Sequence, residues 1–195
     1  MNMKKMVYMA AILVLTMCAS NGFAQDTMKA DDKTQMSGKK NPDSKFMMML
    51  ATVGMNEIGL SQTALSKSSN EEVKKFAQMM VDDHTKAGDE LKALATSKSV
   101  TLPMEMDAKH KAMNEKLSAM SGSAFDMEYT KAMVKDHEKT VSMLQKEANN
   151  GKDAEAKAFA AKLLPTVQGH LNMAKTMMTS MSGDKKMDSN KTSGM

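Results

Sequence analysis

The sequence predicts an all-α protein, an antiparallel four-helix bundle with one additional short helix. In four long segments the apolar residues recur at steps of three and four, which is the spacing of one face of an α-helix. No segment combines β-branched residues with the alternation that indicates a strand. The connections between the long segments are short, which predicts that consecutive helices lie side by side and antiparallel.

The first predicted helix begins at residues 42–44, Pro-Asp-Ser. Its apolar face includes Glu57, a carboxyl group at a position where an apolar residue is expected. Gly54 and Gly59 flank this glutamate and lower the helix propensity of the segment. We therefore expect the two glycines to allow the close approach of a neighbouring element.

The second helix is predicted to begin after Ser69, which forms a capping box with Glu72, and to end near Lys98. His84 lies on its apolar face. A titratable ring is thus placed on the side of the helix that should be buried.

The additional short helix is predicted to open at Pro103 and to end before Gly122. Ser123 is the expected cap of the next long helix, whose apolar face includes His137. That helix is expected to end at Gly151 with a residue in the left-handed conformation.

The last helix is predicted to begin at Asp153 as its cap and to end near Ser180. Its apolar face includes His170. Pro165 lies inside the helix, where it removes a backbone donor and predicts a bend just before the histidine.

Each long helix carries one polar side chain on its apolar face. In a bundle, inward-facing groups from different helices meet at one level, which is how metal sites in bundles are built. Three imidazoles and one carboxylate suit a single transition metal ion, Zn, Cu, Mn or Fe. His110, on the short helix, is left out of this set. The predicted metal ligands are Glu57, His84, His137 and His170.

Two other interpretations remain open. A structural or stress-related envelope protein would use the same side chains as a hydrogen-bonded polar core, because buried polar groups are normally paired. A small metal-dependent redox enzyme is a third interpretation. The sequence contains neither a Ser-His-Asp arrangement nor a phosphate-binding loop, so we predict no catalytic residue and no organic cofactor.

Two sequence strings identify a relative. They are FD-x-x-Y-x-x-x-MV-x-DH, which ends at His137, and LP-x-x-x-x-HL, which ends at Leu171. On these strings, and over about residues 44–178, the chain resembles an exported bacterial family filed as domain of unknown function 4142, often labelled outer membrane proteins. The resemblance implies a ferritin-like bundle but no activity. It points to the following residues: Glu57, Asp83, His84, Phe125, Asp126, Tyr129, Asp136, His137, Leu164, Pro165, His170 and Leu171.

The chain departs from true ferritins at the metal site. Di-iron carboxylate bundles use Glu-x-x-His on two helices, with a glutamate on each of the other two. In this chain the residues three positions before the predicted histidine ligands are Val81, Val134 and Val167. Since the bridging carboxylates are missing, we expect at most one metal ion and no ferroxidase chemistry.

The N-terminus has the layout of a secretory signal peptide, residues 1–24. Two lysines precede an apolar run, residues 6–17, that is too short to span a bilayer, and small residues ending at Ala24 follow. Cleavage after Ala24 would give a periplasmic or secreted protein with no transmembrane segment in the mature chain. The alternative is a lipoprotein anchored through Cys18, because the residues before Cys18 resemble a lipoprotein processing box.

Two polar segments flank the predicted domain. Residues 25–41 lack an apolar period and are predicted to form a disordered linker. The helical bundle is then expected to span residues 42–180, and the polar residues 181–195 to form a disordered tail.

The composition argues against nucleic-acid binding. The net charge is only +4, every basic residue is a lysine, and aromatic residues make up 4% of the chain. Recognition of bases and phosphates depends on arginine and on aromatic stacking, so nucleic acid is not an expected partner.

Methionine is unusually frequent, with 26 residues in the chain. Helical cores use methionine as an adaptable filler, and thioether sulfur is also a soft ligand that suits Cu(I). The sequence leaves both interpretations open.

Overall fold

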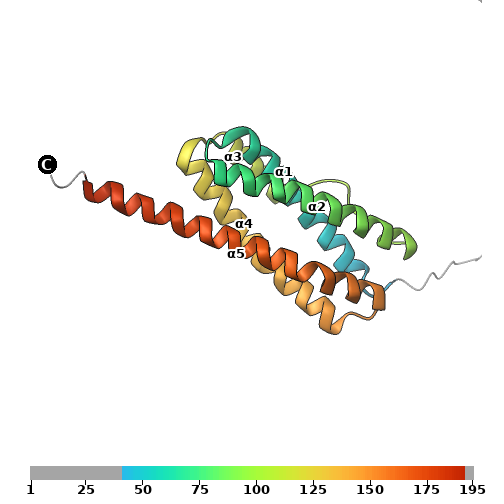
Figure 1. The fold of residues 1–195 in the computed structure, drawn as a ribbon. Helices are drawn as coiled ribbons and strands as arrows, with labels where there is room; N and C mark the ends of the chain where they lie inside the picture. The colour runs from blue at the N-terminus through green and yellow to red at the C-terminus, as the bar shows by residue number, and fades with distance from the viewer. Residues whose placement is uncertain (1–40, 192–195) are drawn as a thin grey trace, which may run out of the picture. The chain divides into compact units, whose positions relative to one another are not determined.

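The structure is a computed structural model and describes residues 41–191. The described part of the chain contains helices and no strand, which confirms the predicted all-α class with four long helices and one short helix (Figure 1). The helices are α1 (Ser44–Lys67), α2 (Glu71–Ser97), α3 (Ala108–Ser118), α4 (Gly122–Asn150) and α5 (Ala154–Lys191).

The long helices form two hairpins. Helices α1 and α2 are joined by residues 68–70, and α4 and α5 by residues 151–153, and these two pairs make the most extensive helix contacts. Short connections of this kind force neighbouring helices to run antiparallel. Helix α1 also packs against α4, and α2 against α5, which closes the bundle, while α3 lies against α1 and α4.

Methionine contributes to both the core and the surface of this bundle. Met47, Met80 and Met133 are completely buried among leucine, valine and phenylalanine side chains, as expected of core fillers. Met104 and Met173, in contrast, are exposed.

Of the two glycines beside Glu57, only one is tightly packed. That glycine is Gly59. A Cβ atom at Gly59 would lie 2.5 Å from the sulfur of Met106, whereas a Cβ atom at Gly54 would meet nothing within 4 Å. The predicted close approach of a neighbour is therefore correct for Gly59 and wrong for Gly54.

Helix α2 begins one residue later than its predicted capping box implies. Its N-cap is Asn70, whose side-chain oxygen accepts hydrogen bonds from the backbone N–H groups of Glu72 and Val73. The prediction of Ser69 as the cap was wrong because serine and asparagine are about equally good caps and the two residues are adjacent.

Helix α3 begins at Ala108 instead of Pro103. Asp107 is its N-cap and accepts a hydrogen bond of 2.9 Å from the backbone N–H of His110. The side-chain amide of Asn56, on α1, also donates to Asp107 at 2.8 Å. Asp107 is thus bonded both to the first turn of α3 and to α1, and the residues before it lie outside the helix.

Helix α4 begins two residues earlier than predicted. Ser121 takes the cap position expected for Ser123, and Gly122 has a φ of 59°, in the left-handed region that favours glycine. The helix ends directly before Gly151 as predicted, but this glycine has a φ of −54°, so the expected left-handed stop is wrong. Glycine is needed there for space, because a Cβ atom would lie 2.7 Å from the backbone carbonyl oxygen of Glu147.

Helix α5 is capped by Asp153, as predicted. The Asp153 carboxylate accepts hydrogen bonds of 3.0 Å from the backbone N–H groups of Glu155 and Ala156. Pro165 lies within the helix.

The C-terminal boundary differs from the prediction. Residues 181–191, expected to belong to a disordered tail, continue α5 as a helix. Met181 packs against the core, and adding turns to an existing helix requires no new nucleation. Residues 192–195 lie outside the described residues.

At the N-terminal side, Asn41 already belongs to the folded domain. Its side chain donates to Asp153 at 3.0 Å and accepts from the backbone N–H of Asp43 at 2.9 Å. The predicted signal peptide with Cys18, and the linker up to residue 40, lie outside the described residues and stay predictions. None of the described helices is long and apolar enough to span a bilayer.

The cap of α5 gives a pH-dependent prediction. Lys98, together with the backbone N–H of Ala156, lowers the pKa of Asp153 to about 2. We expect Asp153→Ala to lower the free energy of unfolding by about 1 kcal/mol at neutral pH. Since the folded-state pKa lies below the unfolded value, this contribution is present above about pH 4 and is lost as the pH falls towards 2.

Urea denaturation at neutral pH and near pH 2 measures how the mutation changes the free energy of unfolding. Asp153→Asn is the matched control, because it keeps the capping oxygen and removes the charge. An equal loss of stability in Asp153→Ala at neutral and acid pH would contradict this account.

Candidate metal centre

Four polar side chains meet in the core, one from each long helix. Each histidine lies three or four positions after a buried apolar residue of its own helix, so the helical period turns it inwards. The exposed fractions of the four residues are very small: Glu57 1%, His84 8%, His137 0% and His170 2%.

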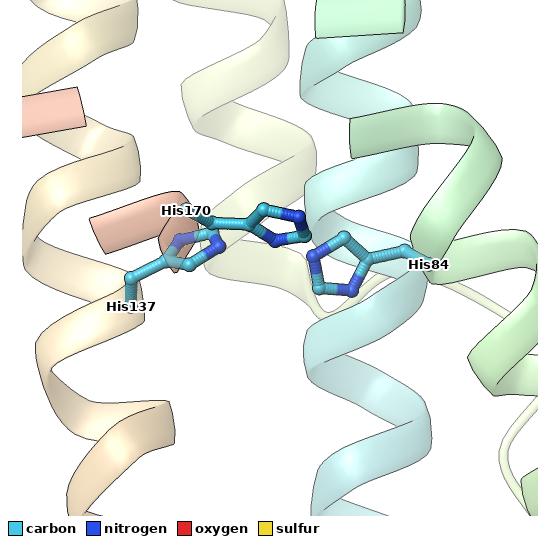
Figure 2. Close-up of side chains that lie close together, drawn as sticks. All are labelled: His84, His137 and His170. Atoms are coloured by element: carbon cyan, nitrogen blue, oxygen red, sulfur yellow. The ribbon is translucent and has the colours of Figure 1, made fainter. Parts of the chain in front are cut away.

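The three imidazole rings point towards one another in the core, edge-on or tilted and not stacked (Figure 2). Their ring centroids are 5.7 Å apart for His84 and His137, 5.4 Å for His84 and His170, and 5.6 Å for His137 and His170. One nitrogen of each ring lies within 4.8 Å of a nitrogen of each of the others. Three nitrogens bound to one ion at about 2.0 Å would lie roughly 3–4 Å apart, so the rings are close to this arrangement and need only a small adjustment to share an ion.

His137 is oriented by its own helix. Its Nδ1 lies 2.9 Å from the backbone carbonyl oxygen of Met133, one turn earlier. A carbonyl only accepts, so Nδ1 carries the proton and the lone pair is on Nε2. This Nε2 is buried and has no hydrogen-bond partner in the protein.

His170 is oriented by a neighbouring helix. Its Nε2 lies 2.9 Å from the carboxylate of Asp83 on α2, and its Nδ1 is buried without a partner. Asp83 therefore supports the histidine of another helix and not its sequence neighbour His84. Together, His137 and His170 show the same pattern, with one nitrogen occupied and the other free.

Glu57 lies beside the rings. Its two carboxyl oxygens are 3.3 Å from Nδ1 of His84 and 3.1 Å from Nδ1 of His137. Neither contact has hydrogen-bond geometry, so both oxygens are buried without a hydrogen-bond partner, and so is Nε2 of His84. The structure thus brings all four predicted residues together, but the three histidines alone form the group with mutually close ligand atoms.

Burial determines the charge of this cluster. It raises the pKa of Glu57 well above 4.5, with a smaller contribution from the negative charge of Asp136. Burial, and then the neighbouring His137 and His170, lower the pKa of His84 to about 3. The pKa of His137 is lowered to about 4, again chiefly by burial. At neutral pH the rings of His84 and His137 are therefore unprotonated, the form that binds a metal.

His110, which is not among the predicted metal ligands, lies in a separate network. Its Nδ1 is 2.8 Å from Asp107 and its Nε2 is 3.1 Å from Asp136. Both of its ring nitrogens have partners, so His110 offers no free lone pair. The sequence does not show which ring nitrogens have hydrogen-bond partners, and this is the feature that separates His110 from the three core histidines.

Other residues singled out by the family resemblance have packing roles. Phe125 stacks against Tyr129 with ring centroids 6.2 Å apart, and the Tyr129 hydroxyl lies 2.8 Å from that of Ser61. Asp126 accepts a 2.6 Å hydrogen bond from the hydroxyl of Ser68. These contacts connect α4 to α1 and to the turn between α1 and α2.

The chain was compared with models of protein families. The model described as domain of unknown function (DUF4142) matches residues 26–177. No curated protein matches the chain.

Solved structures of low sequence identity share the fold. A DUF305 fragment from Deinococcus radiodurans is 13% identical with a TM-score of 0.64, covering 71% of this chain and 95% of its own. CopM in its Cu(II)-bound form is 21% identical with a TM-score of 0.61, covering 71% and 96%. A DUF305 protein from Streptomyces coelicolor, inferred to be secreted, is 12% identical with a TM-score of 0.64, covering 73% and 94%.

The buried cluster predicts how the stability of the metal-free protein depends on pH. Below about pH 6.5 His84 and His137 are protonated in the unfolded chain but not in the folded one, so stability falls as the pH is lowered. Each contributes roughly 1.4 kcal/mol per pH unit within that window. Glu57 acts in the opposite sense, because the folded state keeps its proton above pH 4.5.

We therefore expect Glu57→Gln to steepen the loss of stability between about pH 6.5 and 4.5, because the opposing carboxyl group is removed. Urea denaturation in the presence of a chelator measures the slope. Glu138→Gln, which changes an exposed carboxylate paired with Lys175, is the control and should leave the slope unchanged. A wild-type slope in Glu57→Gln would show that Glu57 is ionised in the folded state.

Proposed function

The chain belongs to the DUF4142 family, whose function is unknown, and we propose that it binds one transition metal ion through His84, His137 and His170. One observation carries the proposal. Each of these rings has one nitrogen that is buried without any hydrogen-bond partner, and the three rings point towards one another. Unpaired buried acceptors are rare in folded proteins, and a shared cation would satisfy all three at once.

The contacts of the remaining nitrogens support the proposal. Histidines that bind metals usually donate their second ring nitrogen to a carbonyl or a carboxylate, which fixes the ring and its tautomer. The Met133 carbonyl does this for His137, and the Asp83 carboxylate for His170. Glu57 lies 3.3 Å from Nδ1 of the third ring, His84, but this contact lacks hydrogen-bond geometry.

Three imidazole ligands favour some metals over others. Imidazole suits Zn(II), Cu(II) and Fe(II), whereas Mn(II) prefers carboxylates. Among these ions Cu(II) generally binds most tightly to a given set of nitrogen ligands. The Cu(II)-bound form of CopM, which shares the fold, is a further reason to test copper first.

The structural interpretation, in which the cluster is only a hydrogen-bonded core, fits these contacts less well. Such a core requires each buried polar atom to have a partner, since an unpaired one costs about 1–3 kcal/mol. Five atoms of the four side chains have none. His110, with both nitrogens paired, is what a structural histidine of this bundle looks like.

We further propose that the protein works in the periplasm or outside the cell. The signal-peptide layout of residues 1–24 supports this location, as does the inferred secretion of the DUF305 protein of similar fold.

The metal hypothesis predicts a ligand-dependent melting temperature. An ion that binds only the folded state stabilises it by mass action, by about 2.7 kcal/mol at a free concentration of one hundred times Kd. We expect Cu(II) or Zn(II) to raise the melting temperature of the tag-free wild-type protein. The shift should be lost in His84→Ala, His137→Ala and His170→Ala.

His110→Ala is the matched control, since it removes a partly buried histidine outside the cluster and should keep the full shift. Differential scanning calorimetry with and without each ion gives the readout, and elemental analysis should find one ion per chain. A shift that persists in His137→Ala, or no shift with any ion, would rule out this site.

A further inference from the structure

A cavity of about 430 Å³ adjoins the candidate metal centre. It lies between α1, α2 and α5 and is bordered by the segment from Val100 to Met104, which connects α2 to α3. Its volume is within the range of cavities that hold small organic molecules. A metal ion alone needs far less space, so the metal proposal does not account for this cavity.

The wall of the cavity is apolar over most of its area. Three helices contribute aliphatic side chains to it: Leu50, Val53, Ile58, Leu91, Leu163 and Val167. The polar groups in the wall include Glu57, Asp83, His84 and His170. These belong to the histidine cluster, so the cavity reaches the proposed metal centre at that end.

Glycine residues keep part of this space open. Gly54 on α1 and Gly88 on α2 both line the cavity, and a Cβ atom at either would meet nothing within 4 Å. Glycine inside a helix is about 1 kcal/mol less favourable than alanine. Neither glycine is required by a close neighbour, and both lie where a larger side chain would reduce the volume.

We propose that this cavity binds an uncharged, largely apolar small molecule with one hydroxyl or carbonyl oxygen, and that this oxygen lies at the histidine end. Apolar walls disfavour any full charge, and the Asp83 carboxylate disfavours an anion in particular. Lys92 also borders the cavity, but it is exposed to solvent.

The position of the oxygen follows from the metal centre and rests on the function proposed above. A metal held by three histidines has an open fourth position, which a water molecule or a ligand oxygen can take. His84 and His170 both line the cavity, so that position is accessible from it. Binding of the apolar part of the molecule depends on the cavity alone and not on the metal.

Three ligands of similar shape test the charge and the oxygen separately: toluene, p-cresol and p-toluate. Binding is measured as displacement of a neutral naphthylamine fluorescent probe from the full chain, with and without Cu(II). Toluene and p-cresol should displace the probe at concentrations at least tenfold below p-toluate. Only p-cresol should change the visible spectrum of the Cu(II)-loaded protein.

Gly54→Leu and Gly88→Leu fill the cavity and should weaken binding of p-cresol and toluene at least tenfold. Both variants should keep the metal-induced rise in melting temperature. Gly169→Leu is the matched control, because a Cβ atom at Gly169 also meets nothing within 4 Å, yet this glycine does not line the cavity. It should keep wild-type binding of both the ligand and the metal.

The outcomes separate the two proposals. Unchanged ligand binding in both cavity variants, no binding in wild type, or preferred binding of p-toluate would overturn the cavity assignment. Ligand binding that Gly54→Leu abolishes, in a protein whose melting temperature no metal shifts, supports the cavity and overturns the metal function. A Cu(II) spectrum that p-cresol leaves unchanged would overturn the placement of the oxygen.

Discussion

The arrangement of this bundle depends on four ionisable side chains buried at its centre, each of which must be uncharged or paired with a partner. A buried charge is strongly unfavourable, so burial raises the pKa of Glu57 and lowers those of His84 and His137. These shifts favour the uncharged forms of Glu57, His84 and His137. The uncharged forms lower the electrostatic cost of burial, but they leave nitrogen lone pairs without a hydrogen-bond partner in the protein.

The same cluster connects the long helices. His170 on α5 contacts Asp83 on α2, and Glu57 on α1 lies against His84 on α2 and His137 on α4. A shift of one helix along its axis would separate these groups. The site and the relative register of the helices are therefore parts of one arrangement, and binding an ion there would stabilise the whole bundle and not a local loop.

The helical period and its interruptions predict the class of fold, the five helices and the approach of the four polar residues. Helix starts were less predictable, since neighbouring residues such as Ser69 and Asn70 are equally suitable caps and tertiary contacts decide between them. The pairing of Asp83 with His170, and the space beside Gly54, depend on which helices are neighbours. A single sequence does not encode that information in its local pattern.

Fold similarity adds less to the chemistry than to the architecture. The similar solved structures share the fold at identities of 12–21%, which carries over the arrangement of helices and not the ligands. The nature of the donor atoms decides the chemistry instead. X-ray absorption spectroscopy of the Cu(II)-loaded protein tests this most directly, and we predict three imidazole nitrogens at about 2.0 Å and no sulfur. A sulfur ligand at about 2.3 Å would assign the metal to the methionines and contradict the three-histidine centre.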